Sequence, residues 1–179
     1  FLKNEAVLLE MALVRYAMDI LRKEGFTLTI TPDIAREEIA AGIGFVPRGD
    51  ESNIYTLEGT GTCLVGTAEI TLGGYHSGDI INLDDGPILL AGFSHCFRRE
   101  AGAAGKDTRG LLRVHQFDKV EMVKVVHPDE SYKVLEELVE QAEKILQGLE
   151  LPYRVCELAT GDLSFASAKC YDLELWSAG

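Results

Sequence analysis

The chain has 179 residues, of which 46% are hydrophobic and 26% are charged, a composition typical of a globular domain. Its formal net charge of −12 excludes binding of nucleic acid over the whole surface, although basic residues gather between Arg98 and Arg113. No apolar run approaches the ~20 residues that cross a bilayer, so no membrane association is expected. Four scattered cysteines without a CxxC pair are typical of reduced thiols and predict a cytoplasmic protein.

The chain begins with a predicted helix and strand. Apolar residues recur at helical spacing from Asn4 to Lys23, and Gly25 follows where a helix would end. The segment 26–31 alternates and contains β-branched residues, which predicts a strand that Pro32 ends. A short helix is expected over residues 33–41.

Strand-like segments fill the middle of the chain. They are expected at residues 54–57, 63–72, 88–99 and 111–126. A second long helix begins near the acidic pair Asp129 and Glu130, which suits the positive end of a helix dipole. Two further strands are expected at 153–158 and 171–176, with Trp176 in the core. The pattern predicts one α+β domain over residues 1–179, an antiparallel sheet flanked by helices.

The segment from Phe93 to Met122 has the charge pattern most typical of a ligand site. Alternate residues of a strand face the same side, so two strands paired as a hairpin would collect one set of side chains on one face. That set is Arg98, Glu100, Arg113, Phe117 and Glu121. An aromatic ring between guanidiniums and carboxylates favours a platform for a phosphate-containing ligand. A decorated surface hairpin is the alternative.

Four blocks of the chain resemble the class II aminoacyl-tRNA synthetases, in the form of the seryl-tRNA synthetase family. Motif 2 of that family resembles Cys96-Phe-Arg-Arg-Glu100 together with Arg113-Val-His-Gln-Phe-Asp-Lys-Val-Glu121. Leu64-Val-Gly-Thr-Ala-Glu69 is similar to the family's serine-binding Thr-Ala-Glu segment. The helix and strand that end at Pro32 resemble the dimer-forming motif 1, and residues 160–172 resemble the approach to the last catalytic strands. The blocks stand in the family's order.

The resemblance implies a role for each matching residue. Arg98 would be the catalytic residue, binding the α-phosphate of ATP and the substrate carboxylate. The other residues implied to bind ATP are Glu100 at the adenine amino group, Arg113 toward the γ-phosphate, Val114, and Phe117 stacked on the adenine ring. The residues implied to bind serine are Thr67, Ala68, Glu69, Arg98 and Glu121.

The resemblance also implies the partners of the protein. These are ATP with Mg²⁺, L-serine, serine tRNA with its acceptor end near the loop 101–110, and a second copy of the chain in a homodimer. The family's metal-binding acidic strand, its motif 3 and its N-terminal tRNA-binding helical arm are expected outside residues 1–179, so no metal ligand is expected within them. The chain would then be the middle part of a catalytic domain and would be inactive by itself.

The residue types suit the chemistry of adenylate formation. A carboxylate attacks the α-phosphate, and a fixed guanidinium donates charge-assisted hydrogen bonds that strengthen as negative charge builds on the phosphate oxygens. Carboxylates suit the ammonium group and hydroxyl of serine. Two alternatives stay open. One is a synthetase-like paralogue that activates an amino acid for a carrier protein or a biosynthetic pathway, and the other is a non-catalytic dimerisation module.

Overall fold

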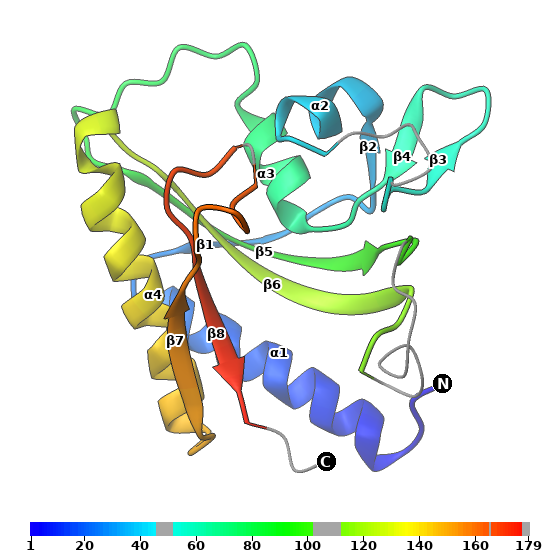
Figure 1. Ribbon diagram of the computed structural model, residues 1–179, viewed down its shortest axis with the longest axis vertical. Coiled ribbons are helices and arrows are strands. Elements are labelled where there is room, and N and C mark those ends of the chain that lie inside the picture. The colour runs from blue at the N-terminus through cyan, green and yellow to red at the C-terminus, as the bar shows by residue number, and fades with distance from the viewer. Residues whose placement is uncertain (46–51, 102–111, 165, 177–179) are drawn as a thin grey trace. The chain divides into compact units, whose positions relative to one another are not determined.

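A computed structural model of the chain describes residues 1–45, 52–101, 112–164 and 166–176 (Figure 1). The chain forms two compact units, Phe1–Val125 and Val126–Gly179. The elements of the first unit, in chain order, are α1 (Glu5–Lys23), β1 (Thr27–Ile30), β2 (Ile34–Arg36), α2 (Glu37–Gly42), β3 (Thr56–Leu57), β4 (Thr62–Leu64), α3 (Ala68–Tyr75), β5 (Ile88–Phe97) and β6 (Gln116–Val125).

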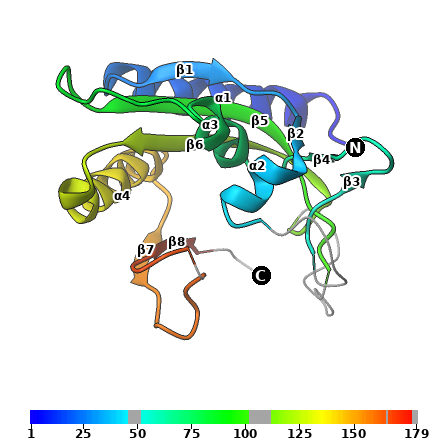
Figure 2. The same ribbon diagram turned by 90° about the horizontal axis from the view of Figure 1, so that it is seen from above.

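A three-stranded sheet in the order β1-β5-β6 is the frame of the first unit. β5 and β6 pair antiparallel along their whole length, which confirms the expected hairpin, whereas β1 lies parallel to β5. Because side chains alternate along a strand, the sheet has two faces that need cover. α1 packs on one of them and α3 on the other (Figures 1 and 2).

The first helix agrees with the sequence prediction, but only part of its apolar surface is covered. Leu21, near its end, is fully buried in the first unit. Leu8, Leu9 and Met11 are instead 67%, 60% and 65% exposed. The first half of α1 therefore presents a row of apolar side chains that none of the described residues buries.

The segment 63–72 does not form the single strand predicted from the sequence, and that prediction was wrong. β4 ends at Leu64, and α3 begins at Ala68. Between them Thr67 is the N-cap of α3, because its side-chain oxygen accepts a hydrogen bond from the Glu69 backbone N–H over 3.2 Å. A short apolar run does not distinguish a strand from a buried helix by its periodicity, and here the run forms a helix that Thr67 caps.

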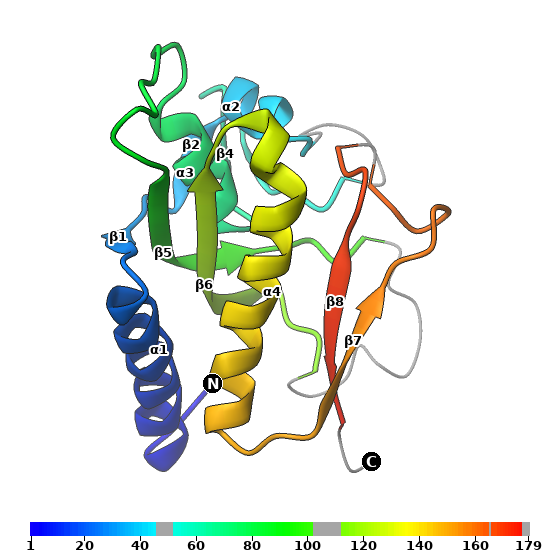
Figure 3. The same cartoon turned by 90° about the vertical axis from the view of Figure 1, so that its left-hand side faces the viewer.

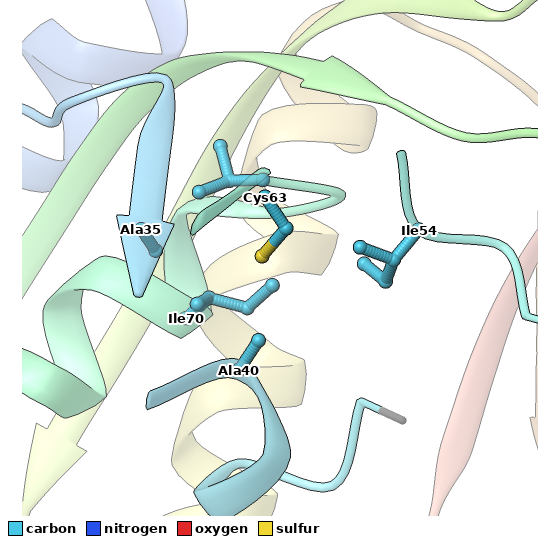
Figure 4. Packing of buried hydrophobic residues seen from close by; sticks show 6 residues of the cluster. Ala35, Ala40, Ile54, Cys63 and Ile70 are labelled. Carbon is cyan, nitrogen blue, oxygen red and sulfur yellow. The ribbon is translucent and has the colours of Figure 1, made fainter. Parts of the chain in front are cut away.

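A small second sheet, in the order β2-β4-β3, packs with α2 and α3 around a compact core. Five members of this core point toward one another in Figure 4: Ala35, Ala40, Ile54, Cys63 and Ile70. The expected short helix over residues 33–41 is thus a strand followed by a helix, β2 and α2. This cluster fixes the start of α3, which carries the Thr-Ala-Glu segment.

The second unit contains a 3₁₀ turn (Pro128–Glu130), α4 (Ser131–Gly148) and the antiparallel pair β7 (Tyr153–Glu157) and β8 (Tyr171–Leu175) (Figure 3). The long helix and both strands agree with the sequence prediction. Trp176 is 71% exposed, so its expected place in a core was wrong. Among the described parts of both units, no helix is long and apolar enough to cross a membrane.

Candidate active site on the β5–β6 hairpin

Thr67 is the centre of the candidate site, and its hydroxyl is saturated with hydrogen bonds. The residue is fully buried. Its Oγ1 donates to Glu121 Oε2 over 2.6 Å, and it accepts from the Glu69 backbone N–H and from Lys119 Nζ over 3.2 and 3.1 Å. A hydroxyl offers one donor and two acceptor positions, so all three are used. The Thr-Ala-Glu segment and the second strand of the motif 2 hairpin are thereby joined at one point.

A glycine explains how α3 comes close enough to the sheet for this contact. Gly92 of β5 lies opposite Glu121 of β6. A Cβ atom at Gly92 would lie 2.8 Å from Leu72 Cδ1 and 3.1 Å from Ala68 Cβ, closer than side chains normally pack. Ala68 is itself fully buried. The absent side chain at Gly92 therefore lets the first turn of α3 rest directly on the sheet beside Glu121.

Two carboxylates and one ammonium group lie around Thr67. Lys119 stands between Phe117 and Glu121 on the same face of β6, and its ammonium forms an ion pair with Glu121. Glu69 is exposed, but the partial loss of water around its carboxyl group raises the pKa of that group. The negative charge of the neighbouring Glu121 raises this pKa further, and the positive charge of Lys119 lowers it. The cluster has a net negative charge and suits a ligand that brings an ammonium group.

Arg98 lies beside this cluster, where the hairpin approaches its tip. Its Nε donates to the carbonyl oxygen of Gly66 over 3.1 Å, one residue before Thr67. Its guanidinium carbon lies 5.3 Å from the centre of the Phe117 ring, a cation–π contact. Arg98 and Phe117 are therefore brought together as expected. Arg98 follows the last residue of β5, however, so the strand alternation used to place it does not apply.

Glu100 and Arg113 also meet, but outside the strands to which they were assigned. Arg113 Nη1 donates to Glu100 Oε2 over 2.8 Å. Glu100 has φ of 53°, the left-handed region, and β6 begins only at Gln116, so the predicted extension of both strands was wrong. Val114 follows Arg113 and is half-buried. Of the proposed tRNA-proximal loop 101–110, all but Ala101 lies outside the described residues.

Two residues that the sequence reasoning missed, Asn53 and Tyr55, hold the chain in place beyond β5. His115 Nδ1 lies 2.7 Å from the Tyr55 hydroxyl and 3.1 Å from the Arg98 carbonyl oxygen. Asn53 accepts hydrogen bonds at two positions, from the Arg99 backbone N–H at its carbonyl oxygen and from the Ala101 backbone N–H at Oδ1. No spacing or motif links the segment of Asn53 and Tyr55 to the hairpin, so nothing in the sequence pointed to it.

Lys119 was also missed, although the signal was present. It is two residues from Phe117 and two from Glu121, so the alternation that grouped those two includes Lys119 as well. Its position places a cation next to both carboxylates of the cluster.

An open hollow lies in the second unit. It has a volume of about 540 Å³ and is lined by Pro152, Tyr153, Arg154, Glu174, Leu175 and Trp176. Its charged side chains, Arg154 and Glu174, are paired with each other across the β7–β8 hairpin at 2.5 Å. Among the residues that the structure describes, its lining includes none of the candidate residues and no unpaired charge.

The fold and the site define the class of this protein. Residues 55–179 match the model of the tRNA synthetase class II core domain (G, H, P, S and T), and the chain belongs to this family. Its similar curated relatives include serine--tRNA ligases. It is 59% identical over 179 residues to a serine--tRNA ligase of Treponema denticola, covering all of this chain and 42% of the relative. The chain therefore spans less than half the length of the curated relatives that it matches.

Solved structures give the same result. The seryl-tRNA synthetase of Pyrococcus horikoshii, complexed with ATP, is 44% identical with a TM-score of 0.92, covering 98% of this chain and 39% of that one. The cytoplasmic serine-tRNA ligase of Naegleria fowleri, in complex with AMP, is 37% identical with a TM-score of 0.92, covering 98% and 42%. The resemblance to seryl-tRNA synthetases and the fold class expected from the sequence are both confirmed.

Proposed function

We propose that the full-length protein activates L-serine with ATP to give seryl-adenylate and then transfers the seryl group to the 3′ end of serine tRNA. The observation that carries this proposal is the hydrogen bond between Thr67 and Glu121. It joins the two segments that resemble the serine-binding and ATP-binding motifs into one site. The serine--tRNA ligase relatives and the nucleotide-bound neighbours support the same reading.

The serine pocket is formed where α3 meets β6. Glu69 and Glu121 provide carboxylates for the ammonium group and the side-chain hydroxyl of serine, and Thr67 orients Glu121. A site built to hydrogen-bond a substrate hydroxyl rejects an analogue that lacks it by roughly 10⁴–10⁵, because its polar groups are then left unpaired. This pocket therefore favours serine over alanine and glycine.

The ATP site follows on the same face of the hairpin. The Phe117 ring is the platform for adenine, and Arg98 is the donor to the α-phosphate. Glu100 and Arg113, paired in the structure, separate to bind the adenine amino group and the γ-phosphate, with Val114 beside them. A serine carboxylate oxygen then forms a bond to the α-phosphorus as the bond to pyrophosphate breaks. Arg98 stabilises the charge that builds on the α-phosphate oxygens.

Mg²⁺ accompanies ATP in this proposal, and no ligand for it is assigned among the described residues. Among residues 1–45, 52–101, 112–164 and 166–176, no group of three or more His, Cys, Asp or Glu side chains is placed to hold a metal ion. Mg²⁺ in nucleotide sites is held largely by substrate phosphates with one or two carboxylates. No step of the reaction is therefore assigned to it here.

A homodimer is the proposed assembly, formed through α1 and β1. Leu8, Leu9 and Met11 on the helix and Ile30 at the end of the strand, which is 81% exposed, leave an apolar surface. Exposed apolar patches of this kind are typical of interfaces. The proposed location is the cytoplasm, since all four cysteines are free thiols.

Amino-acid-dependent ATP–pyrophosphate exchange tests the proposal. The full-length protein should catalyse exchange with serine and at least about tenfold less with threonine, alanine or glycine. A preference for any of those three would contradict serine as the substrate. Charging of serine tRNA should follow in a second assay. Exchange with serine without charging of tRNA would instead support the paralogue that serves a carrier protein or a biosynthetic pathway.

A further inference from the structure

We propose that Lys119 occupies the position of the substrate ammonium group in the free enzyme, and that an amino acid displaces it by providing its own carboxylate as the new partner of Lys119. The inference rests on the proposed function and assigns to Lys119 the selection of amino acids over simple amines. The ammonium group of Lys119 contacts Thr67 and Glu121, where the ammonium group of a ligand would bind.

The ammonium group of Lys119 and that of a ligand would compete for one acceptor position on the hydroxyl of Thr67. The hydroxyl of Thr67 donates to Glu121 and accepts from the Glu69 backbone and from Lys119. The backbone contact is the N-cap of α3, and the donated hydrogen holds Glu121 in place. The acceptor position filled by Lys119 is therefore the one that a ligand ammonium can take, and Lys119 must leave it.

The charges around the cluster make this exchange selective. Lys119 is the ion-pair partner of Glu121 and offsets the repulsion between Glu121 and Glu69. A ligand ammonium that replaces Lys119 keeps a positive charge beside the two carboxylates, but it leaves the ammonium group of Lys119 without an ion-pair partner. An amino acid corrects this with its carboxylate, whereas an amine without a carboxylate does not. The free energy of displacing Lys119 is thus recovered only by an amino acid.

The position of Lys119 allows the transfer. Its side chain is 34% exposed and has a flexible four-carbon stem, so it can move without unfolding its surroundings. Phe117 precedes it on the same face of β6, and Arg98 lies over the Phe117 ring. A substrate carboxylate between Lys119 and Arg98 would have a cation on each side while its ammonium group is held at Glu121.

Binding of serine and serinol to the full-length protein tests the inference, because serinol keeps the ammonium group and hydroxyls but has no carboxylate. Calorimetry without ATP should show the wild type binding serinol at least about 100-fold more weakly than serine. Lys119→Met should lower this ratio at least about tenfold, with serinol binding more tightly than to the wild type. Lys119→Arg keeps the charge and should keep the discrimination. Lys124→Met removes the same charge from the opposite face of β6 and should leave the ratio unchanged.

The outcomes separate the inference from the proposed function. Equal weakening of both ligands in Lys119→Met would show that Lys119 only supports the pocket, and would overturn the inference. Loss of serine affinity with unchanged serinol affinity would show that Lys119 binds the carboxylate without occupying the ammonium position, and would also overturn it. Absence of serine binding by the wild type would overturn the proposed function itself. A thermal unfolding curve for each variant shows that it is folded when it is assayed.

Discussion

The middle of the β5–β6 hairpin and its open end present side chains in different ways. In the middle, Gly92 and Glu121 are paired in regular strands, and α3 rests directly on them. Beyond β5, Arg98 and Glu100 leave the sheet and are held by individual hydrogen bonds to neighbouring loops. The part of the site proposed to select the amino acid is thus fixed by the fold, while the part proposed to bind phosphate depends on a few separate contacts. Mutations in the open end should therefore lower kcat, whereas mutations in the middle should lower stability and raise KM for serine.

The largest effect is expected at the open end. Arg98→Ala should lower serine-dependent ATP–pyrophosphate exchange by about 10²–10³, because it removes a preorganised donor from the α-phosphate. The loss should lie in kcat more than in KM for serine. Arg99→Ala is the matched control, since Arg99 is exposed and is held through its backbone to Asn53. It should change the rate by less than about threefold. Equal losses for the two variants would contradict the assignment of Arg98.

The middle of the hairpin should respond through packing. Gly92→Ala places a methyl group against Ala68 and Leu72, so α3 must move away from Glu121. We expect a loss of about 1–3 kcal/mol in the free energy of unfolding and a rise of about tenfold in KM for serine. Urea unfolding and exchange kinetics measure the two effects.

Gly42→Ala is the control for this packing effect, because nothing lies within 4 Å of a Cβ atom at that position. It should leave KM and stability close to those of the wild type. If Gly92→Ala behaved in the same way, α3 would not depend on the close approach for its position.

A smaller effect is expected where the chain beyond β5 is anchored. Tyr55→Phe removes the hydroxyl that contacts His115 Nδ1, next to the Arg98 carbonyl oxygen. The backbone N–H of Arg98 still donates to the His115 carbonyl oxygen over 3.0 Å, so the segment keeps part of its support. One hydrogen bond contributes about 0.5–1.5 kcal/mol, and we expect kcat to fall about threefold with unchanged KM for serine. A change in KM alone would place Tyr55 in the amino-acid pocket instead.

The smallest effect concerns stability and pH. The pKa of Glu69 is raised, so its ionisation disfavours the folded state above that pKa, and the penalty disappears as pH falls below the ordinary value of about 4.3. Glu69→Gln should therefore raise Tm slightly at pH 7, by no more than about 2 °C for an exposed residue, and the difference should vanish near pH 4. Thermal unfolding at both pH values measures it. A larger gain at pH 4 than at pH 7 would have the wrong sign.

The sequence predicted the regular parts of this molecule well because their periodicity is long and undisturbed. α1 and α4 have extended helical patterns, and the β5–β6 pairing follows from two alternating segments. Within β6 the same alternation places Phe117 and Glu121 on one face. Lys119 lies between them on that face, so the alternation also predicts Lys119 as a residue of the site.

The failures occur where local hydrogen bonds decide the structure. The apolar run after Thr67 has the composition of a strand, but it forms a helix that the threonine hydroxyl caps and whose apolar side chains are buried. Glu100 departs from strand geometry because its backbone adopts a left-handed conformation. Tyr55 and Asn53 reach the hairpin through tertiary contacts, which no pattern within either segment encodes. Of the partners of Arg98, Phe117 was expected from the alternation, whereas the carbonyl oxygen of Gly66 could be found only in three dimensions.

The central claim is that Thr67 and Glu121 act as a single unit in serine recognition. A double-mutant cycle of Thr67→Ala and Glu121→Gln in the full-length protein, followed by kcat/KM for serine-dependent exchange, tests it most directly. Residues that share one hydrogen bond should show a coupling of about 0.5–3 kcal/mol, so the double variant should lose clearly less than the sum of the two single losses. Additive losses would show that the two segments act independently and would contradict the site described here.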